Sequence, residues 1–252
     1  MGISLIILLG TIDEVTSKVF PELDQRPNFL TGIFNHGVYS TGPFSCVHAG
    51  IANAVIGPVD SHKAPTVPSY LAQSIAQCPD LSTSLLSAPE ILHAQLRKLA
   101  VNATINPLTA IYNCTNGELF EHANIRKYID SMLAEISAVI IAHLGALPQD
   151  FSPSPKSTDA TCLASYQMFS PESLKEEVYK AGRLTYKNIS SMNQDVRAGR
   201  KTEIDYITGW ITKRSRDLGL NSPFNEMVET AVGSSEILDL KTQSNALYEK
   251  MH

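Results

Sequence analysis

The sequence has 252 residues, a formal net charge of −5 at pH 7, 43% hydrophobic residues and 18% charged residues. This length allows one large domain or two ordinary ones, and the composition can support a hydrophobic core. The negative charge and the absence of a basic run argue against a nucleic-acid-binding surface.

The chain opens on an apolar run from Leu5 to Leu9, which we expect to form a short buried strand over residues 3–9. The run is far shorter than the ~20 residues that a membrane-spanning helix needs. It also lacks the basic residues and the longer apolar stretch of a signal peptide. We therefore expect no membrane partner, and a chain that starts inside a strand suggests that an upstream segment is missing.

The first third of the chain carries signals of short elements. Thr11, followed by Glu14, predicts a capping box at the start of a short helix. Glycines separate short apolar runs over residues 29–57, which predicts a meander of strands. Residues 58–66 are rich in Pro, Ser and Asp and are expected to be a loop, and residues 68–86 are expected to form a helix and then a short strand.

The pattern becomes helical from about residue 88, and we place a domain boundary there, between residues 1–88 and 89–252. The clearest helix covers residues 122–144, with Gly145 at its C-cap position. Its apolar face is expected to be core, or the seam of a homodimer through the helical domain: Ile125, Ile129, Met132, Ile136, Val139 and Ile140.

Three further helices are expected, over residues 171–198, 202–218 and 224–250. In the second of these, Thr202 with Asp205 predicts an acidic capping box, and Gly219 predicts the end of the helix. The Pro/Ser-rich segment 148–161 is expected to be a surface insertion.

The cysteines show neither a C-x-x-C pair nor a Cys/His ligand spacing: Cys46, Cys78, Cys114 and Cys162. Scattered cysteines of this kind indicate free thiols in a reducing compartment, which is typical of a cytoplasmic protein. We interpret His36 and His48 as strand histidines. No metal site is therefore predicted.

Three polar residues are spaced four apart in an otherwise apolar helical stretch: Lys98, Asn102 and Asn106. Each step of four along a helix lags by only about 40°, so the side chains form a stripe about 12 Å long on one face. Because the residues between them are apolar, we expect this part of the helix to be buried. Buried polar groups need partners, and solvent, a structural network or a bound polar ligand would each supply them.

Pro107 directly follows this stripe. Proline removes a backbone donor and clashes with the preceding turn, so we expect the helix to kink or restart there, with Asn106 as the N-cap. The stretch ends at Asn116 and Gly117, a dipeptide that predicts a turn.

A second polar cluster follows about seventy residues later. Asn188, Ser191 and Asp195 are spaced i, i+3 and i+7, so they are expected to share a helix face. Glu203 falls in the first turn of the next expected helix, where the helix dipole favours its charge.

Together the two clusters suggest carbonyl reduction, in which a desolvated lysine acts as general acid while amides and a hydroxyl hold the substrate. Each of these residues can also have a purely structural role. Lys98 can be an ordinary helix lysine with its head in solvent, and Asn102 and Asn106 can be packing amides and a cap. Asn116 can serve only the turn. The residues of the second cluster can be surface or first-turn residues.

Residues 98–119 (KLAVNATINPLTAIYNCTNGEL) and 188–209 (NISSMNQDVRAGRKTEIDYITG) closely resemble ketopantoate reductase, also called 2-dehydropantoate 2-reductase. The resemblance extends over residues 10–15, 36–50 and 56–58, and the sequence there is similar to that of the fungal branch of the family. It implies an α/β Rossmann-type NADPH domain followed by an all-α domain like that of 6-phosphogluconate dehydrogenase. The implied activity is reduction of 2-dehydropantoate to (R)-pantoate in pantothenate and coenzyme A biosynthesis.

The resemblance also implies roles for individual residues. Lys98 matches the proton-donating lysine, and Glu203 matches a carboxylate that closes on substrate and cofactor. Val38 falls where the family's backbone touches the nicotinamide side. Substrate-binding roles are implied for Asn102, Asn106, Asn116 and Ser191, with Asn188 nearby in the same role.

The chain departs from the family at its cofactor motif. No G-x-G-x-x-G turn occurs in the sequence, and Ile7 to Gly10 stand where the family reads roughly N-G-M-G. We therefore expect the first half of the cofactor domain to be missing, through a truncated product or a mistaken gene start. One competing hypothesis is a catalytically silent fragment that acts as a helical interaction module or has no function at all. The other is another 3-hydroxyacid-type dehydrogenase that shares the helical domain.

Overall fold

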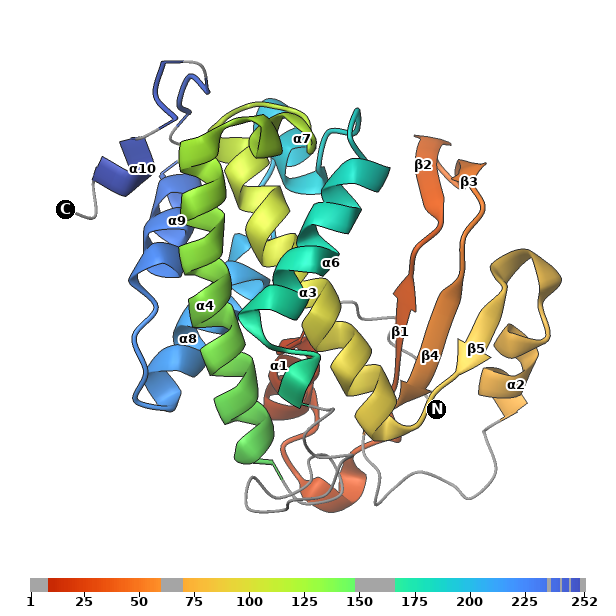
Figure 1. The fold of residues 1–252 in the computed structure, drawn as a ribbon. Helices are drawn as coiled ribbons and strands as arrows, with labels where there is room; N and C mark the ends of the chain where they lie inside the picture. The colour runs from red at the N-terminus through yellow and green to blue at the C-terminus, as the bar shows by residue number, and fades with distance from the viewer. Residues whose placement is uncertain are drawn as a thin grey trace. The chain divides into compact units, whose positions relative to one another are not determined.

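The computed structural model describes residues 9–59, 70–147, 166–234, 237–240, 242–244 and 246–249 (Figure 1). The expected insertion 148–161, and most of the expected strand 3–9 and loop 58–66, lie outside these residues. The chain divides into two compact units, residues 1–95 and residues 96–252.

The first unit combines short helices and strands. Its helices are α1 (Thr11–Val19) and α2 (Tyr70–Ala76), with 3₁₀ turns at Leu23–Gln25 and Pro79–Leu81. Its strands are β1 (Leu30–Phe34), β2 (Gly37–Gly42), β3 (Ser45–Gly50), β4 (Ala54–Pro58) and β5 (Thr83–Leu85). The helix and strand expected over residues 68–86 are α2 and β5.

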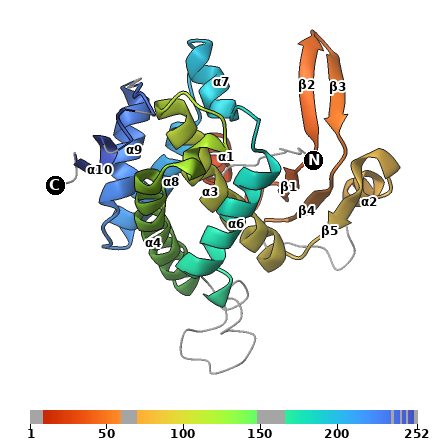
Figure 2. The same cartoon turned by 45° about the horizontal axis from the view of Figure 1, so that its top comes forward.

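β4 is the central strand of a three-stranded sheet, antiparallel to β1 and parallel to β5. Its Ala54 and Ile56 are 0% and 2% exposed, and Ile33 of β1 is 4% exposed, so this sheet carries the core of the unit. β2 and β3 pair only with each other and extend as a separate ribbon (Figures 1 and 2). The strands expected over residues 29–57 are present, but the meander order is wrong because β1 pairs with β4.

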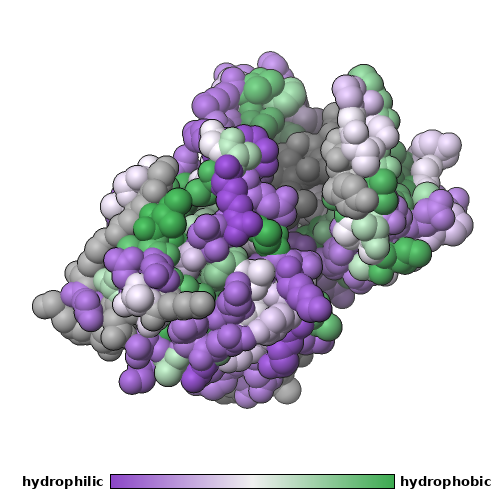
Figure 3. Space-filling view, turned by 90° about the horizontal axis from the view of Figure 1, so that it is seen from above, coloured by the Kyte–Doolittle hydropathy of each residue, from purple (hydrophilic) through white to green (hydrophobic). Residues whose placement is uncertain are grey.

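The ribbon leaves large apolar side chains in solvent. Val38 on β2 is 56% exposed, and Phe44 in the turn is fully exposed with a φ of 56°. Hydrophobic and hydrophilic side chains are intermixed on the molecular face seen in Figure 3. Isolated apolar side chains in solvent are ordinary for a folded protein.

Gly10 is the N-cap of α1 and has a φ of 93°, a left-handed conformation that glycine adopts without strain. No side chain caps this helix, and Thr11 lies in its first turn. The predicted capping box of Thr11 and Glu14 is therefore wrong, because the backbone turn at Gly10 moves Thr11 inside the helix.

α3 (Ala88–Ile111) is a single helix of 24 residues, and the division into two units falls within it, after Gln95. Its start is held by the Glu90 side chain, whose Oε2 accepts the Ser87 N–H and hydroxyl at 2.8 and 2.7 Å. The helix continues through Pro107. The predicted restart with Asn106 as N-cap is therefore wrong, and Asn106 lies inside the helix.

The second unit is all-helical. After α3 it contains α4 (Ala123–Gly145), α6 (Pro171–Leu184), α7 (Ser191–Arg197), α8 (Thr208–Asp217), α9 (Pro223–Gly233) and α10 (Ala246–Glu249), with 3₁₀ turns at Glu118–Glu121 and Ile204–Tyr206. α4 packs against α6, α8 and α9. Its predicted apolar face is at most 1% exposed, so that face is core and not a dimer seam. The helix ends at Gly145, with Ala146 as C-cap.

α4 is long and apolar enough to cross a membrane by length and composition alone. More than half of its most apolar window is buried inside the unit, as in the core helix of a globular domain. Nothing about this helix requires a lipid environment.

The helix expected over residues 171–198 is two helices with a loop between them. α6 ends at Leu184, and α7 begins after Ser190, whose hydroxyl accepts the Asn193 N–H at 3.1 Å. The Tyr186 and Asn188 carbonyls of this loop accept hydrogen bonds from backbone N–H groups that follow α3. Asn188 lies in this loop, so the predicted helix face shared by Asn188 and Asp195 is wrong.

The predicted capping box of Thr202 and Asp205 is also wrong, because α8 begins only at Thr208 after the 3₁₀ turn. Glu203 is the N-cap of that turn and makes no side-chain cap hydrogen bond. Gly219 follows α8 with a φ of 69°, as expected of a terminating glycine.

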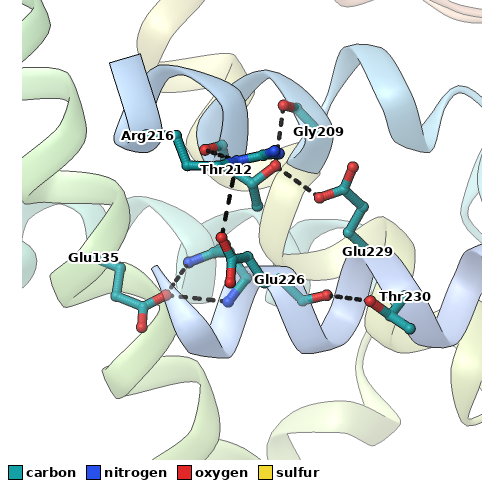
Figure 4. A network of polar contacts seen from close by, with 8 residues as sticks. Glu135, Gly209, Thr212, Arg216, Glu226, Glu229 and Thr230 are labelled. Carbon is teal, nitrogen blue, oxygen red and sulfur yellow. Dashed lines mark hydrogen bonds and ion pairs between the residues drawn. The ribbon is translucent and has the colours of Figure 1, made fainter. Parts of the chain in front are cut away.

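Glu135 of α4 holds the start of α9 (Figure 4). Its carboxylate accepts the backbone N–H groups of Phe224 and Asn225 at 3.0 and 3.1 Å, and the Asn225 amide at 2.6 Å. Nearby, the Thr212 hydroxyl of α8 donates to Glu229 of α9 at 2.7 Å. These bonds join three helices through half-buried carboxylates and the buried side-chain donors of Asn225 and Thr212.

Candidate active site

Lys98, Asn102 and Asn106 are all half-buried on α3. The apolar side chains between them pack into the unit, as Leu99 and Ile105 show with 5% and 3% exposure. Burial lowers the pKa of Lys98, because the charged ammonium is partly removed from solvent. These three polar side chains therefore lie on an otherwise apolar helix and remain partly accessible to solvent.

A loop from the end of α3 pairs with the loop between α6 and α7. The Asn116 N–H donates to the Asn188 carbonyl at 2.9 Å, and the Gly117 N–H donates to the Tyr186 carbonyl at 3.0 Å. Asn116 is 8% exposed, and its side-chain amide donates to the Thr185 hydroxyl at 2.9 Å. The structure therefore brings Asn116 and Asn188 together, although 72 residues separate them in the sequence.

Gly117 is required by this close approach. A Cβ atom on Gly117 would lie 2.0 Å from the Tyr186 ring, well inside van der Waals contact. Asn116-Gly117 therefore does more than form the tight turn expected from the sequence.

Two buried residues that the sequence reasoning missed tie α7 to the end of α3. Asn193 is 0% exposed, and its amide donates to the Cys114 carbonyl at 3.0 Å. The Ser190 hydroxyl lies 2.6 Å from the Thr109 hydroxyl of α3. The spacing of Ser190 and Asn193, an N-cap and its N3 residue, was the available signal.

Ser191 is the first residue of α7, next to Ser190, and is exposed like Asn188. The Ser190 hydroxyl also lies 3.4 Å from the Asn106 carbonyl. This contact places the start of α7, and with it Ser191, beside Asn106 of the stripe.

Glu203 lies near a second carboxylate. Partial burial, together with the charge of Asp195, raises the pKa of Glu203 although the residue as a whole is exposed. Asp195 is itself paired with Arg200, whose Nε lies 2.8 Å from Asp195 Oδ1. Val38 belongs to the first unit, and its expected contact with the nicotinamide stays a prediction.

Cys114 has a buried thiol, and burial, with a smaller effect of the Glu118 charge, raises its pKa to about 12. A thiol held protonated is a poor nucleophile and a poor metal ligand. Across the part of the chain that the structure describes, no group of three or more His, Cys, Asp or Glu residues could hold a metal ion.

Residues 90–236, more than half of the chain, match the family described as "Ketopantoate reductase PanE/ApbA C terminal". The chain is 36% identical over 227 residues to ketoisovalerate reductase BEA2 of Gibberella fujikuroi, covering 81% of this chain and 49% of that protein. It is 34% identical over 229 residues to 2-dehydropantoate 2-reductase of Salmonella typhi, covering 90% of this chain and 63% of that protein. The chain thus spans about half to two thirds of the length of these relatives.

Two solved structures share the fold. A probable 2-dehydropantoate 2-reductase from Bacillus subtilis superposes with a TM-score of 0.69 at 22% identity, covering 93% of this chain and 68% of that one. D-mandelate dehydrogenase in a ternary structure with NADH and anilino(oxo)acetate superposes with a TM-score of 0.64 at 20% identity, covering 93% and 67%.

An α/β unit followed by an all-helical unit is the fold that the chain shares with these solved structures, as the sequence predicted. The chain belongs to the ketopantoate reductase family.

Proposed function

We propose that the protein serves in the NADPH-dependent reduction of 2-dehydropantoate to (R)-pantoate, a cytoplasmic step of pantothenate and coenzyme A biosynthesis, with Lys98 as proton donor. One observation carries the proposal. Lys98 is half-buried, its pKa is lowered by desolvation, and it shares a helix face with Asn102 and Asn106. A depressed pKa brings a lysine closer to the range in which it acts as a general acid.

The chain's own residues would act on the substrate side. As the ketone is reduced, its oxygen gains negative charge and takes a proton from Lys98 Nζ, so that an N–H bond breaks and an O–H bond forms. Solvent then reprotonates the neutral amine. Asn102 and Asn106, with Asn116, Asn188 and Ser191, offer amide and hydroxyl groups that suit a substrate carboxylate and hydroxyl.

A nicotinamide cofactor supplies the hydride when it is bound. The family relationship, and the NADH in D-mandelate dehydrogenase, support this class of cofactor. The sequence contains no G-x-G-x-x-G turn to hold a pyrophosphate, so we assign the pyrophosphate to no residue of this chain. On the nicotinamide side we propose only Glu203 and the backbone of Val38.

The second candidate substrate is 2-oxoisovalerate, because one relative is a ketoisovalerate reductase and is slightly more similar in sequence. The two acids differ by one hydroxymethyl group. An enzyme that hydrogen-bonds this hydroxyl discriminates strongly against the acid that lacks it, because buried polar groups are then left unpaired. A comparison of the two acids therefore decides between the candidates.

The first test is to titrate the purified chain with NADPH by fluorescence and then assay both acids. Binding at micromolar levels with turnover of 2-dehydropantoate supports the proposal. Absence of NADPH binding would instead favour the silent helical fragment.

The second test is Lys98→Ala, with the exposed Lys201→Ala as matched control. We expect Lys98→Ala to lower turnover about 100-fold or more, with little change in NADPH affinity, because a general acid contributes about 10²–10⁴-fold. Lys201→Ala should leave turnover unchanged. An unchanged turnover number in Lys98→Ala would refute the assignment of Lys98.

A further inference from the structure

One pair of buried hydroxyls joins the two segments that carry the proposed substrate-binding residues. Thr109 is 0% exposed on α3, and Ser190 is 6% exposed at the N-cap of α7. Their oxygens lie 2.6 Å apart across 81 positions of sequence, a strong hydroxyl–hydroxyl hydrogen bond.

The direction of the protons in this pair follows from the distances. The Thr109 hydroxyl lies 2.9 Å from both the Ile105 and the Asn106 carbonyl, so its proton has a backbone acceptor. Ser190 then donates to Thr109 and accepts the Asn193 N–H at 3.1 Å. The reverse direction would leave Ser190 only the Asn106 carbonyl at 3.4 Å, a much weaker acceptor.

This chain of bonds runs from the first turn of α7 to the turn of α3 that contains Asn106 and Pro107. The Ile105 and Asn106 carbonyls of that turn are the two acceptors that the Thr109 hydroxyl can reach. Thr109 donates to one of these carbonyls and accepts from the N-cap of α7. No other hydroxyl that the structure describes on α3 makes both kinds of bond: the equally buried Thr104 donates at 2.8 Å to the Ala100 carbonyl, within its own helix.

We infer that Thr109 is a positioning residue, whose hydroxyl bridges α3 to the N-cap of α7 and so holds Ser191 in place beside Asn106. The inference rests on the proposed function, because it assigns Thr109 to the placement of substrate-binding groups. Thr109 itself touches no reacting atom. Its removal should weaken substrate binding and leave the chemical step largely intact.

The test compares Thr109→Val with Thr104→Val. Both substitutions keep the shape of threonine and remove a buried hydroxyl that donates within α3, so their effects on the helix itself are matched. Only Thr109→Val also removes the bridge to α7. Thr109→Ser keeps the hydroxyl and serves as the rescue variant.

Two readouts are measured on the full chain: amide hydrogen exchange over residues 188–194, and the split between KM and kcat for 2-dehydropantoate and 2-oxoisovalerate. For Thr109→Val we expect exchange about tenfold faster and KM about five- to tenfold higher, with kcat within about twofold, as for the loss of one neutral hydrogen bond. Thr104→Val and Thr109→Ser should stay near wild type in both readouts.

Equal effects of Thr109→Val and Thr104→Val would overturn the inference, and so would failure of Thr109→Ser to restore the wild-type values. A wild-type chain that neither binds nor reduces either acid would overturn the proposed function instead. The exchange comparison needs no substrate, and it would then decide alone whether Thr109 positions α7.

Discussion

The helical unit contains two clusters of polar side chains, one around Glu135 and one along Lys98, Asn102 and Asn106, and they differ in what their side chains contact. Around Glu135, each carboxylate oxygen accepts from donors on α9, and the cluster joins helices that lie side by side (Figure 4). Along Lys98, Asn102 and Asn106, the polar side chains keep partial access to solvent. A carboxylate that accepts hydrogen bonds from a neighbouring helix supports the fold, whereas a stripe of polar side chains that solvent can reach is also within reach of a ligand.

The largest effect on stability that would sharpen this comparison is expected when Glu135 is replaced. Glu135→Ala leaves two backbone N–H groups and the Asn225 amide without their acceptor, so we expect the free energy of unfolding to fall by about 3 kcal/mol. The exposed Glu176→Ala is the control and should change stability by less than about 0.5 kcal/mol. Chemical denaturation measures both variants.

The same substitution should leave the affinity for a 2-oxo acid unchanged in the protein that remains folded. If Glu135→Ala weakened substrate binding as much as Lys98→Ala lowers turnover, the separation of the two clusters would be wrong.

A pH-dependent effect of similar size concerns His143 of α4, which lies against Trp210 with ring centroids 5.2 Å apart. Burial, with a lesser effect of the Arg214 charge, lowers the pKa of His143 to about 4. Because the folded pKa lies below the unfolded value of about 6.5, protonation favours the unfolded chain. The contribution of His143 to the free energy of unfolding should therefore be constant above pH 6.5. As the pH is lowered from 6.5 to 4, this contribution should fall by about 1.4 kcal/mol per pH unit.

His143→Gln should remove that part of the acid sensitivity, and denaturant unfolding at pH 4.5, 5.5 and 7 would show it. Replacing the half-buried His122, the N-cap residue of the same helix, provides the comparison for the loss of a histidine. A slope that persists in His143→Gln would show that another group carries it.

The smallest effect is expected at the ion pair between Lys175 and Asp130, whose atoms lie 2.7 Å apart at the surface. The two side chains are 43% and 45% exposed, so solvent screens their attraction. Lys175→Ala should cost at most about 0.5–1 kcal/mol, and less at high salt. A loss above about 2 kcal/mol would show that distance alone is a better guide to the strength of a pair than exposure.

Periodicity predicted the long elements well. The apolar face of α4 and the helical half after residue 88 follow from spacing alone, because one buried stripe of side chains fixes the helix. The break within the segment 171–198 was not predicted. The interruption between Leu184 and Ser190 depends on bonds to residues about seventy positions earlier, and a local pattern does not contain them.

For the site, the sequence predicted which residues to consider but not how they are held. The spacing of Lys98, Asn102 and Asn106 placed them on one face, and the structure keeps them on one helix. Thr109 gave no signal, because a buried threonine in a helix usually bonds only its own backbone. Pro107 gave a misleading signal, since the preference of proline for a helix start yields here to the packing of the whole helix.

The Cys114 thiol offers a practical consequence. It is shielded and protonated at neutral pH, and its carbonyl is the anchor for Asn193. An alkylating reagent can therefore reach this sulfur only when the joint between the ends of α3 and α7 opens. The exposed Cys46 should be modified at once. The slower rate at which Cys114 is labelled would measure how often this part of the protein opens locally.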